Sequence, residues 1–96
     1  MATTKLSAEK VAEELSNLEG WKAEADSLAI AKQFTFKDHI AALGFVVSVA
    51  TTAEKLDHHP EVNWVYNKVT FRLSTHDASG VTAKDIDLAT KIEALT

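Results

Sequence analysis

Three of the four histidines in this 96-residue chain occupy positions where an imidazole could exchange protons with a bound molecule. His58 and His59 stand at the end of a predicted helix, directly before Pro60, and His76 follows the last predicted strand. Side chains at the ends of helices and strands project into clefts while the backbone stays anchored. Because the ordinary pKa of histidine is about 6.5, such side chains can act as general acids and bases near neutral pH.

The surroundings of the histidine pair support this interpretation but also allow a simpler one. The negative end of a helix and the carboxylates of Asp57 and Glu61 favour a protonated imidazole. A histidine at a helix end is also common as a plain capping residue, and a proline ends a helix without any further role. Trp64 and Tyr66 could offer flat surfaces for stacking, although packing in a core or an interface is their commoner use. We expect His39 to be a surface histidine or one whose hydrogen bonds are satisfied within the protein.

A zinc site is the alternative use of three histidines, since zinc can be held by three such side chains and a water molecule. Adjacent residues of a helix point about 100° apart, however, so His58 and His59 cannot easily share one ion. The i, i+4 ligand spacing of zinc-binding helices is missing. The sequence also lacks a dinucleotide-binding glycine motif, a phosphate-binding loop and a nucleophile elbow. We therefore expect neither a metal nor an organic cofactor.

The amino-acid composition excludes several classes of function. The chain has no cysteine, which excludes disulfides and thiol chemistry. Its formal charge is −4 and Arg72 is its single arginine, with no basic cluster, so we expect no direct binding of nucleic acid. No apolar run resembles a signal peptide or a membrane span, which predicts a soluble, cytoplasmic protein. Residues 1–96 are expected to form one domain, and a domain this small often gains stability by self-association.

The first half of the chain predicts a helix, a hairpin and a longer helix. Apolar residues at helical spacing predict a first helix between the N-cap Ser7 and the stop signal Gly20. Alternation of apolar residues predicts strands over 21–25 and 28–36, and the period changes to helical over 38–58. The residues expected on the apolar sides of the second strand and the long helix are Leu28, Ile30, Phe34 and Phe36, and Ile40, Leu43, Val47, Ala50 and Ala53.

The second half predicts another hairpin and a last helix. Alternation returns over 62–66 and 69–73, and a turn-like segment over 75–80 precedes the capping box formed by Thr82 and Asp85. The resulting order is α-β-β-α-β-β-α. This order predicts an α+β fold with a four-stranded, mainly antiparallel sheet and three helices packed on one face.

At this point the residues resemble a known family. Glu54, His58-His59-Pro60, Tyr66, His76 and Asp85 have the identities and spacings of the signature of pterin-4a-carbinolamine dehydratases. Further segments that look like this family extend the resemblance to roughly residues 20–95. The resemblance implies the fold expected above, assembled as a homodimer or homotetramer. It also implies removal of water from a 4a-hydroxytetrahydropterin to give a quinonoid dihydropterin, which recycles the cofactor of aromatic amino-acid hydroxylases without a metal.

The resemblance also implies roles for individual residues. His58 and His76 are expected to protonate the departing hydroxyl, while His59 holds the pterin and takes or relays the proton of N5. Residues expected to orient the histidines or to bind the pterin are Glu54, Asp57, Pro60, Thr75, Asp77 and Asp85. For Asp85, a purely structural role in the capping box stays open beside this one.

Two other functions remain possible from the sequence. Animal members of the family also act as dimerisation cofactors of a homeodomain transcription factor through a helical surface, so a protein-binding coactivator module is the main alternative. A metal-binding hydrolase is the other.

Overall fold

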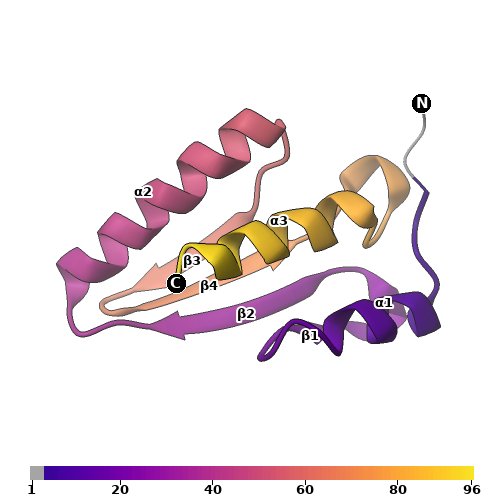
Figure 1. Ribbon diagram of the computed structural model, residues 1–96, viewed down its shortest axis with the longest axis horizontal. Coiled ribbons are helices and arrows are strands. Elements are labelled where there is room, and N and C mark those ends of the chain that lie inside the picture. Colours follow the sequence, from indigo (N-terminus) through magenta and orange to yellow (C-terminus); the bar gives the residue numbers. More distant parts are fainter. Residues whose placement is uncertain (1–3) are drawn as a thin grey trace.

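The computed structural model describes residues 4–96 and confirms the predicted order of helices and strands (Figure 1). Its sheet is antiparallel throughout, with the strand order β1-β2-β4-β3. No helix among these residues is both long and apolar enough to cross a membrane. The elements are α1 (Ala8–Leu15), β1 (Lys22–Ala23), the 3-10 turn η1 (Ala25–Ser27), β2 (Ile30–Thr35), α2 (His39–Leu56), β3 (Glu61–Val65), β4 (Lys68–Leu73), the 3-10 turn η2 (His76–Ala78) and α3 (Ala83–Ala94).

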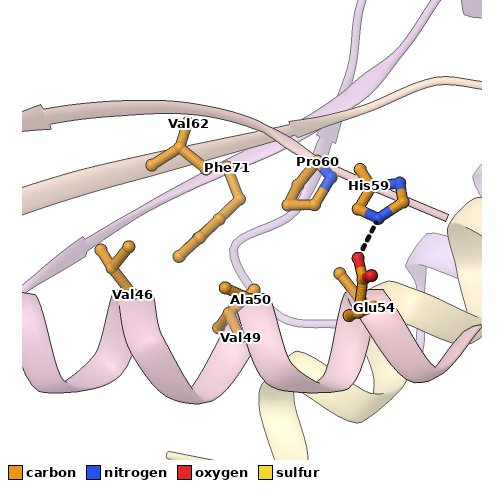
Figure 2. A pocket seen from close by; sticks show the side chains of 9 residues that line it. Val46, Val49, Ala50, Glu54, His59, Pro60, Val62 and Phe71 are labelled. Atoms are coloured by element: carbon orange, nitrogen blue, oxygen red, sulfur yellow. Dashed lines mark hydrogen bonds and ion pairs between the residues drawn. The ribbon is translucent and has the colours of Figure 1, made fainter. Parts of the chain in front are cut away.

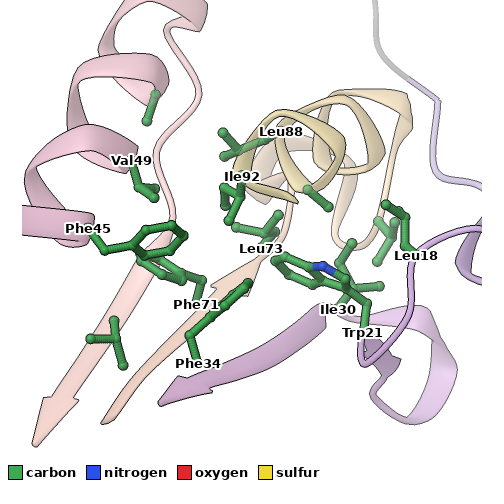
Figure 3. Packing of buried hydrophobic residues seen from close by; sticks show 14 of the residues in the cluster. Leu18, Trp21, Ile30, Phe34, Phe45, Val49, Phe71, Leu73, Leu88 and Ile92 are labelled. Atoms are coloured by element: carbon green, nitrogen blue, oxygen red, sulfur yellow. The ribbon is translucent and has the colours of Figure 1, made fainter. Parts of the chain in front are cut away.

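One hydrophobic core lies between the sheet and the helices (Figure 3). Its centre is a cluster of three aromatic rings, Phe34 on β2, Phe71 on β4 and Phe45 on α2, whose centroids are 5.1 to 5.9 Å apart. Leu88 and Ile92 of α3 are fully buried in the same core. These contacts hold α2 and α3 against the sheet.

The predicted buried face of α2 was wrong at most of its positions. Ile40 and Val47 are 71% and 56% exposed, and Leu43 is also exposed. The buried residues of this helix are Ala42, Phe45, Val49 and Ala53. Two apolar stripes satisfy the same three- and four-residue spacing on this helix, and only the stripe that carries Phe45 fits against the aromatic rings of the sheet. The other stripe is left on the surface.

The first hairpin is shorter than predicted, and Leu28 is not on its buried face. Leu28 is 46% exposed because Asp26 and Ser27 have left-handed backbone angles, with φ of 59° and 51°, and delay the start of β2 to Ile30. Lys32, in the middle of β2, ties this strand to two other parts of the chain. Its ammonium group donates to Glu93 on α3 at 2.8 Å and to the Glu19 carbonyl at 2.9 Å.

Tyr66, predicted in a strand, is a turn residue between β3 and β4 with a φ of 51°. Its carbonyl accepts hydrogen bonds from Trp64 Nε1 and His39 Nδ1, both at 2.8 Å. The His39 ring stacks on Trp64 with centroids 4.5 Å apart, so this surface histidine has partners for its ring. Because His39 begins α2, Tyr66 lies at the opposite end of that helix from His58.

The face of the sheet that carries no helices is tied together by Arg72. Its guanidinium donates to both carboxylate oxygens of Glu24, at 2.6 and 2.9 Å, and lies 3.8 Å from Glu61. The hydrogen bond with Arg72 lowers the pKa of Glu24. The chain's single arginine is thus engaged by carboxylates on the sheet.

Candidate active site

The three predicted histidines line one polar hollow of about 380 Å³. His58 and His59 reach it from the segment that follows α2, because Asp57 adopts a left-handed conformation (φ 52°) and ends the helix. His76 reaches it from the start of η2, directly after β4. The side chains around the hollow are Asp57, His58, His59, Ser74, Thr75, His76, Asp77 and Lys84. The structure therefore brings the three histidines to one hollow, although they come from two separate parts of the chain.

A buried carboxylate holds His58. Asp85, fully buried at the start of α3, lies with its Oδ1 2.5 Å from His58 Nε2. Its Oδ2 accepts from the Thr75 hydroxyl at 2.8 Å and from the Thr82 backbone N–H at 2.9 Å. A carboxylate without water around it is stable only when its oxygens are hydrogen-bonded, and here both are. The predicted capping box is confirmed, and the same residue also fixes the His58 ring.

The direction of each hydrogen bond in this network follows from the number of available protons. The Thr75 hydroxyl donates its one proton to Asp85, so the contact of 2.6 Å between Thr75 and Thr82 has Thr82 as the donor. Thr82 Oγ1 in turn accepts from the Lys84 backbone N–H. A carboxylate is an acceptor, so His58 Nε2 carries a proton and Nδ1 is the ring nitrogen left for other partners.

His59 and His76 are held far less tightly. His59 Nε2 lies 2.8 Å from Glu54 Oε1, but the two side chains are 56% and 79% exposed. His76 is exposed, and within residues 4–96 no side chain forms a hydrogen bond with its ring. The site thus combines one fixed imidazole with two that can adjust to a ligand.

A second, apolar hollow of about 220 Å³ adjoins the first and shares His59 (Figure 2). It lies between α2 and the strands β3 and β4, with the His59–Glu54 pair at one end. Pro60, predicted to bind or orient the substrate, lines this hollow and not the polar one. Its lining residues are Val46, Val49, Ala50, Ala53, Glu54, His59, Pro60, Val62 and Phe71.

Three residues near the histidines were missed by the sequence analysis. Ser74 and Lys84 line the polar hollow, and Thr82 belongs to the buried network. Thr82 was recognised only as an N-cap, since a pattern of caps cannot show that β4 ends beside the same helix. Lys84, next to the motif residue Asp85 in the first turn of α3, could have been suspected from that position.

The donor groups do not assemble into a metal centre. Within the part of the chain that the structure describes, no three side chains of the metal-binding types are arranged around a common point. His58 and His59 each direct Nε2 at a different carboxylate. The expectation of a metal-free reaction stays a prediction.

Comparisons with known proteins match this chain to pterin dehydratases. A model of the family described as "Pterin 4 alpha carbinolamine dehydratase" matches residues 4–95. A Sinorhizobium fredii protein named "Putative pterin-4-alpha-carbinolamine dehydratase" is 48% identical over 93 residues, which cover 97% of this chain and 89% of the relative. Among solved structures, a "transcriptional coactivator/pterin dehydratase" from Brucella melitensis is 42% identical with a TM-score of 0.91, and the match covers 96% of this chain and 98% of that one.

A more distant structure has the same fold. A pterin dehydratase-like protein described as a RuBisCO assembly factor in the alpha-carboxysome matches with a TM-score of 0.69 at 19% identity. The match covers 80% of this chain and 89% of that one. At this identity the likeness concerns the fold alone.

Proposed function

Because the chain belongs to the pterin-4a-carbinolamine dehydratase family, we propose that it removes water from a 4a-hydroxytetrahydropterin. The product is a quinonoid dihydropterin. The observation that carries the proposal is the convergence of His58, His59 and His76 on one solvent-accessible hollow. No other set of residues in the described chain brings three titratable rings together in this way.

The reaction needs an acid and a base. The C4a–O bond breaks and the departing hydroxide takes a proton from an acid, which gives water. The N5–H bond loses its proton to a base, and the electron pair of that bond forms the C4a=N5 double bond. One proton is taken up and one released, so the step needs neither an oxidant nor a reductant. A positioned acid or base typically accelerates such a step by about 10²–10⁴-fold.

The geometry supports a division of these roles. His76, exposed and without a side-chain partner within residues 4–96, is free to approach the hydroxyl and protonate it. His58 assists through Nδ1 in its doubly protonated form, which gives up the Nδ1 proton and keeps the Nε2–H on Asp85. His59 takes the proton of N5, and Glu54 stabilises the resulting imidazolium at 2.8 Å.

The remaining polar residues act through these histidines or on the ring. Asp85 and Thr75 are positioning residues for His58, and Thr82 orients the Thr75 hydroxyl. Asp57 and Asp77 lie on the wall of the polar hollow, where they can accept hydrogen bonds from the amino groups of a pterin. Pro60 shapes the neighbouring apolar hollow.

Turnover of a synthetic 4a-hydroxytetrahydropterin tests the proposal directly. We expect the purified chain to accelerate the appearance of the quinonoid product, followed by its absorbance, in buffer treated with a chelator. A rate equal to the spontaneous dehydration at every protein concentration would contradict the proposal. Two expectations from the sequence stay predictions: that the protein recycles the pterin cofactor of an aromatic amino-acid hydroxylase, and that it is cytoplasmic.

We also propose that the chain forms a homodimer or homotetramer through the exposed stripe of α2. Ile40, Leu43 and Val47 are 71%, 40% and 56% exposed on consecutive turns of this helix. Contiguous apolar surface of this kind is costly in water and marks a contact with another protein. A protein-binding role, the alternative from the sequence, would use the same stripe.

Val47→Glu is expected to shift the assembly toward monomer, since a buried, unpaired charge in an interface is strongly unfavourable. Sedimentation velocity measures the change. Ser48→Glu is the matched control, because this exposed neighbour on α2 lies outside the stripe and its substitution should leave the assembly unchanged. A wild-type chain that sediments as a monomer would overturn self-association.

A further inference from the structure

The loop that carries His76 rests on the turn of the first hairpin, which has no role in the chemistry described so far. At this end of the molecule, the residues after β4 lie against η1 and the segment before α1 (Figure 1). The Val81 N–H donates to the Ser27 carbonyl at 2.9 Å, and the Ser74 hydroxyl donates to the Leu28 carbonyl at 2.6 Å. Two hydrogen bonds thus join the loop to the first hairpin, one on each side of His76.

The loop is short and closed at its base. Thr75 and Gly80 form an isolated antiparallel bridge, in which the Thr75 N–H donates to the Gly80 carbonyl at 3.0 Å. Both residues are buried, whereas His76 is exposed. Asp85 holds the Thr75 side of the bridge, and η1 holds the Gly80 side through the neighbouring Val81.

Gly80 permits the close approach of the two turns. A Cβ atom at this position would lie 2.8 Å from the Ser27 carbonyl oxygen, which is closer than real Cβ atoms come to such neighbours. It would also lie 2.5 Å from Cε of Lys5, but that side chain is exposed and can move aside. The Ser27 carbonyl cannot move without weakening its hydrogen bond with Val81. Any larger residue in place of Gly80 therefore pushes the loop away from η1.

Left-handed backbone angles gather at the same contact. Asp26 and Ser27 in η1 have φ of 59° and 51°, and Ser79, next to Gly80, has a φ of 58°. These are three of the five non-glycine residues with a positive φ in the described part of the chain. Such angles cost free energy and persist only where surrounding contacts determine the backbone, as often happens at active sites. The contact thus determines the backbone of both turns.

We propose that Ser27 and Gly80 are positioning residues for His76, because their contact sets the place of the loop that carries its ring. The inference rests on the proposed function, since it takes His76 to be the acid that protonates the departing hydroxyl. No side chain within residues 4–96 holds the His76 ring by a hydrogen bond, so the backbone of the loop determines where the ring can reach. A displacement of about 1 Å at a catalytic group can lower a rate by about 100-fold.

Gly80→Ala is expected to lower kcat by about 10- to 100-fold and to change KM by less than about 2-fold, because it misplaces the acid. The loss should be absent when His76→Ala is already present, since a ring that has been removed cannot be misplaced. In the His59→Ala background it should persist in full. Gly44→Ala is the matched control, because a Cβ at this glycine of α2 meets no atom within 4 Å, and its rates should equal those of the wild type.

Ser74→Ala is a milder variant that keeps the test decisive if Gly80→Ala does not fold. It removes the hydrogen bond to Leu28 on the other side of the loop, and kcat should fall by about 2- to 10-fold. Ser74 also lines the polar hollow, so the His76→Ala background is again the discriminating measurement. An equal loss with and without His76 would show that Ser74 does not act through this ring and would overturn the inference.

NMR without substrate separates the inference from the proposed function. In Gly80→Ala, the amide proton of Val81 should exchange faster with solvent and the ring signals of His76 should shift, while those of His39 stay unchanged. If these changes occur but the wild type does not turn over the carbinolamine, the positioning of His76 stands and the proposed function fails. A folded Gly80→Ala with wild-type kcat, or with an equal loss in the His76→Ala background, would overturn the inference and leave the proposed function standing.

Discussion

Replacement of His76 by alanine is expected to slow dehydration by about 10²–10⁴-fold, the usual contribution of one positioned acid. In this variant, a loss of activity can be told apart from a loss of stability. His76 is exposed at the start of η2, and its ring has no hydrogen-bonded partner among the described residues, so its loss leaves no buried group unpaired. The free energy of unfolding should change by less than about 0.5 kcal/mol. Rates come from the absorbance assay, and stability comes from urea titration.

His39→Ala is the matched control for His76→Ala. It removes the same side chain from an exposed position at the opposite end of α2, against Trp64 and Tyr66, so the dehydration rate should stay at the wild-type value. His59→Ala should lower the rate by a similar factor to His76→Ala, again with little effect on stability, because its bond with Glu54 is exposed. Wild-type rates in both His59→Ala and His76→Ala would remove the catalytic assignment.

His58 is a poorer choice for the first test. Its side chain is only 13% exposed, and its removal would leave the buried carboxylate of Asp85 without one of its partners. A loss of activity in His58→Ala would therefore mix chemistry with unfolding. This difference among three histidines of one motif could not be predicted from their spacing.

The sequence was sufficient for features with a local cause. The capping box of Thr82 and Asp85 depends only on neighbouring residues and is as predicted. The same holds for the end of α2 before Pro60, where the backbone cannot continue as a helix. The predicted stop of the first helix at Gly20 was wrong, because α1 already ends at Leu15 and Gly20, with a φ of 87°, lies in the turns that follow. The order of elements followed from these signals and from the apolar periodicity.

Features that depend on contacts between different helices and strands could not be predicted from the sequence. The choice between the two apolar stripes of α2 is made by Phe34 and Phe71, which pack against Phe45 from the strands β2 and β4. The partner of Asp85 is likewise decided by β4, which brings Thr75 against α3. The position of Pro60 in a separate hollow depends on residues of α2, β3 and β4, which line that hollow together with it.

Asp85→Asn is expected to reduce kcat by about 10²–10³-fold, because it reverses the hydrogen bonding of His58. The asparagine oxygen would keep the bonds from Thr75 and Thr82, since both are donors. Its NH2 group would then face His58 Nε2, which must become an acceptor, and the ring proton moves to Nδ1. In serine proteases, the same substitution beside the catalytic histidine leaves the geometry intact but costs about 10⁴-fold through the wrong tautomer.

The tautomer of His58 distinguishes this positioning role from a purely structural one. Nitrogen NMR of the imidazole should show Nε2 protonated in the wild type and Nδ1–H with an unprotonated Nε2 in Asp85→Asn. The variant should also lose about 1–3 kcal/mol of unfolding free energy through its weakened buried bonds. Asp87→Asn is the matched control, because it makes the same change on the exposed side of α3, where Asp87 pairs with Lys91. If Asp85→Asn lowers stability while the tautomer and kcat stay at wild-type values, Asp85 is a helix cap and nothing more.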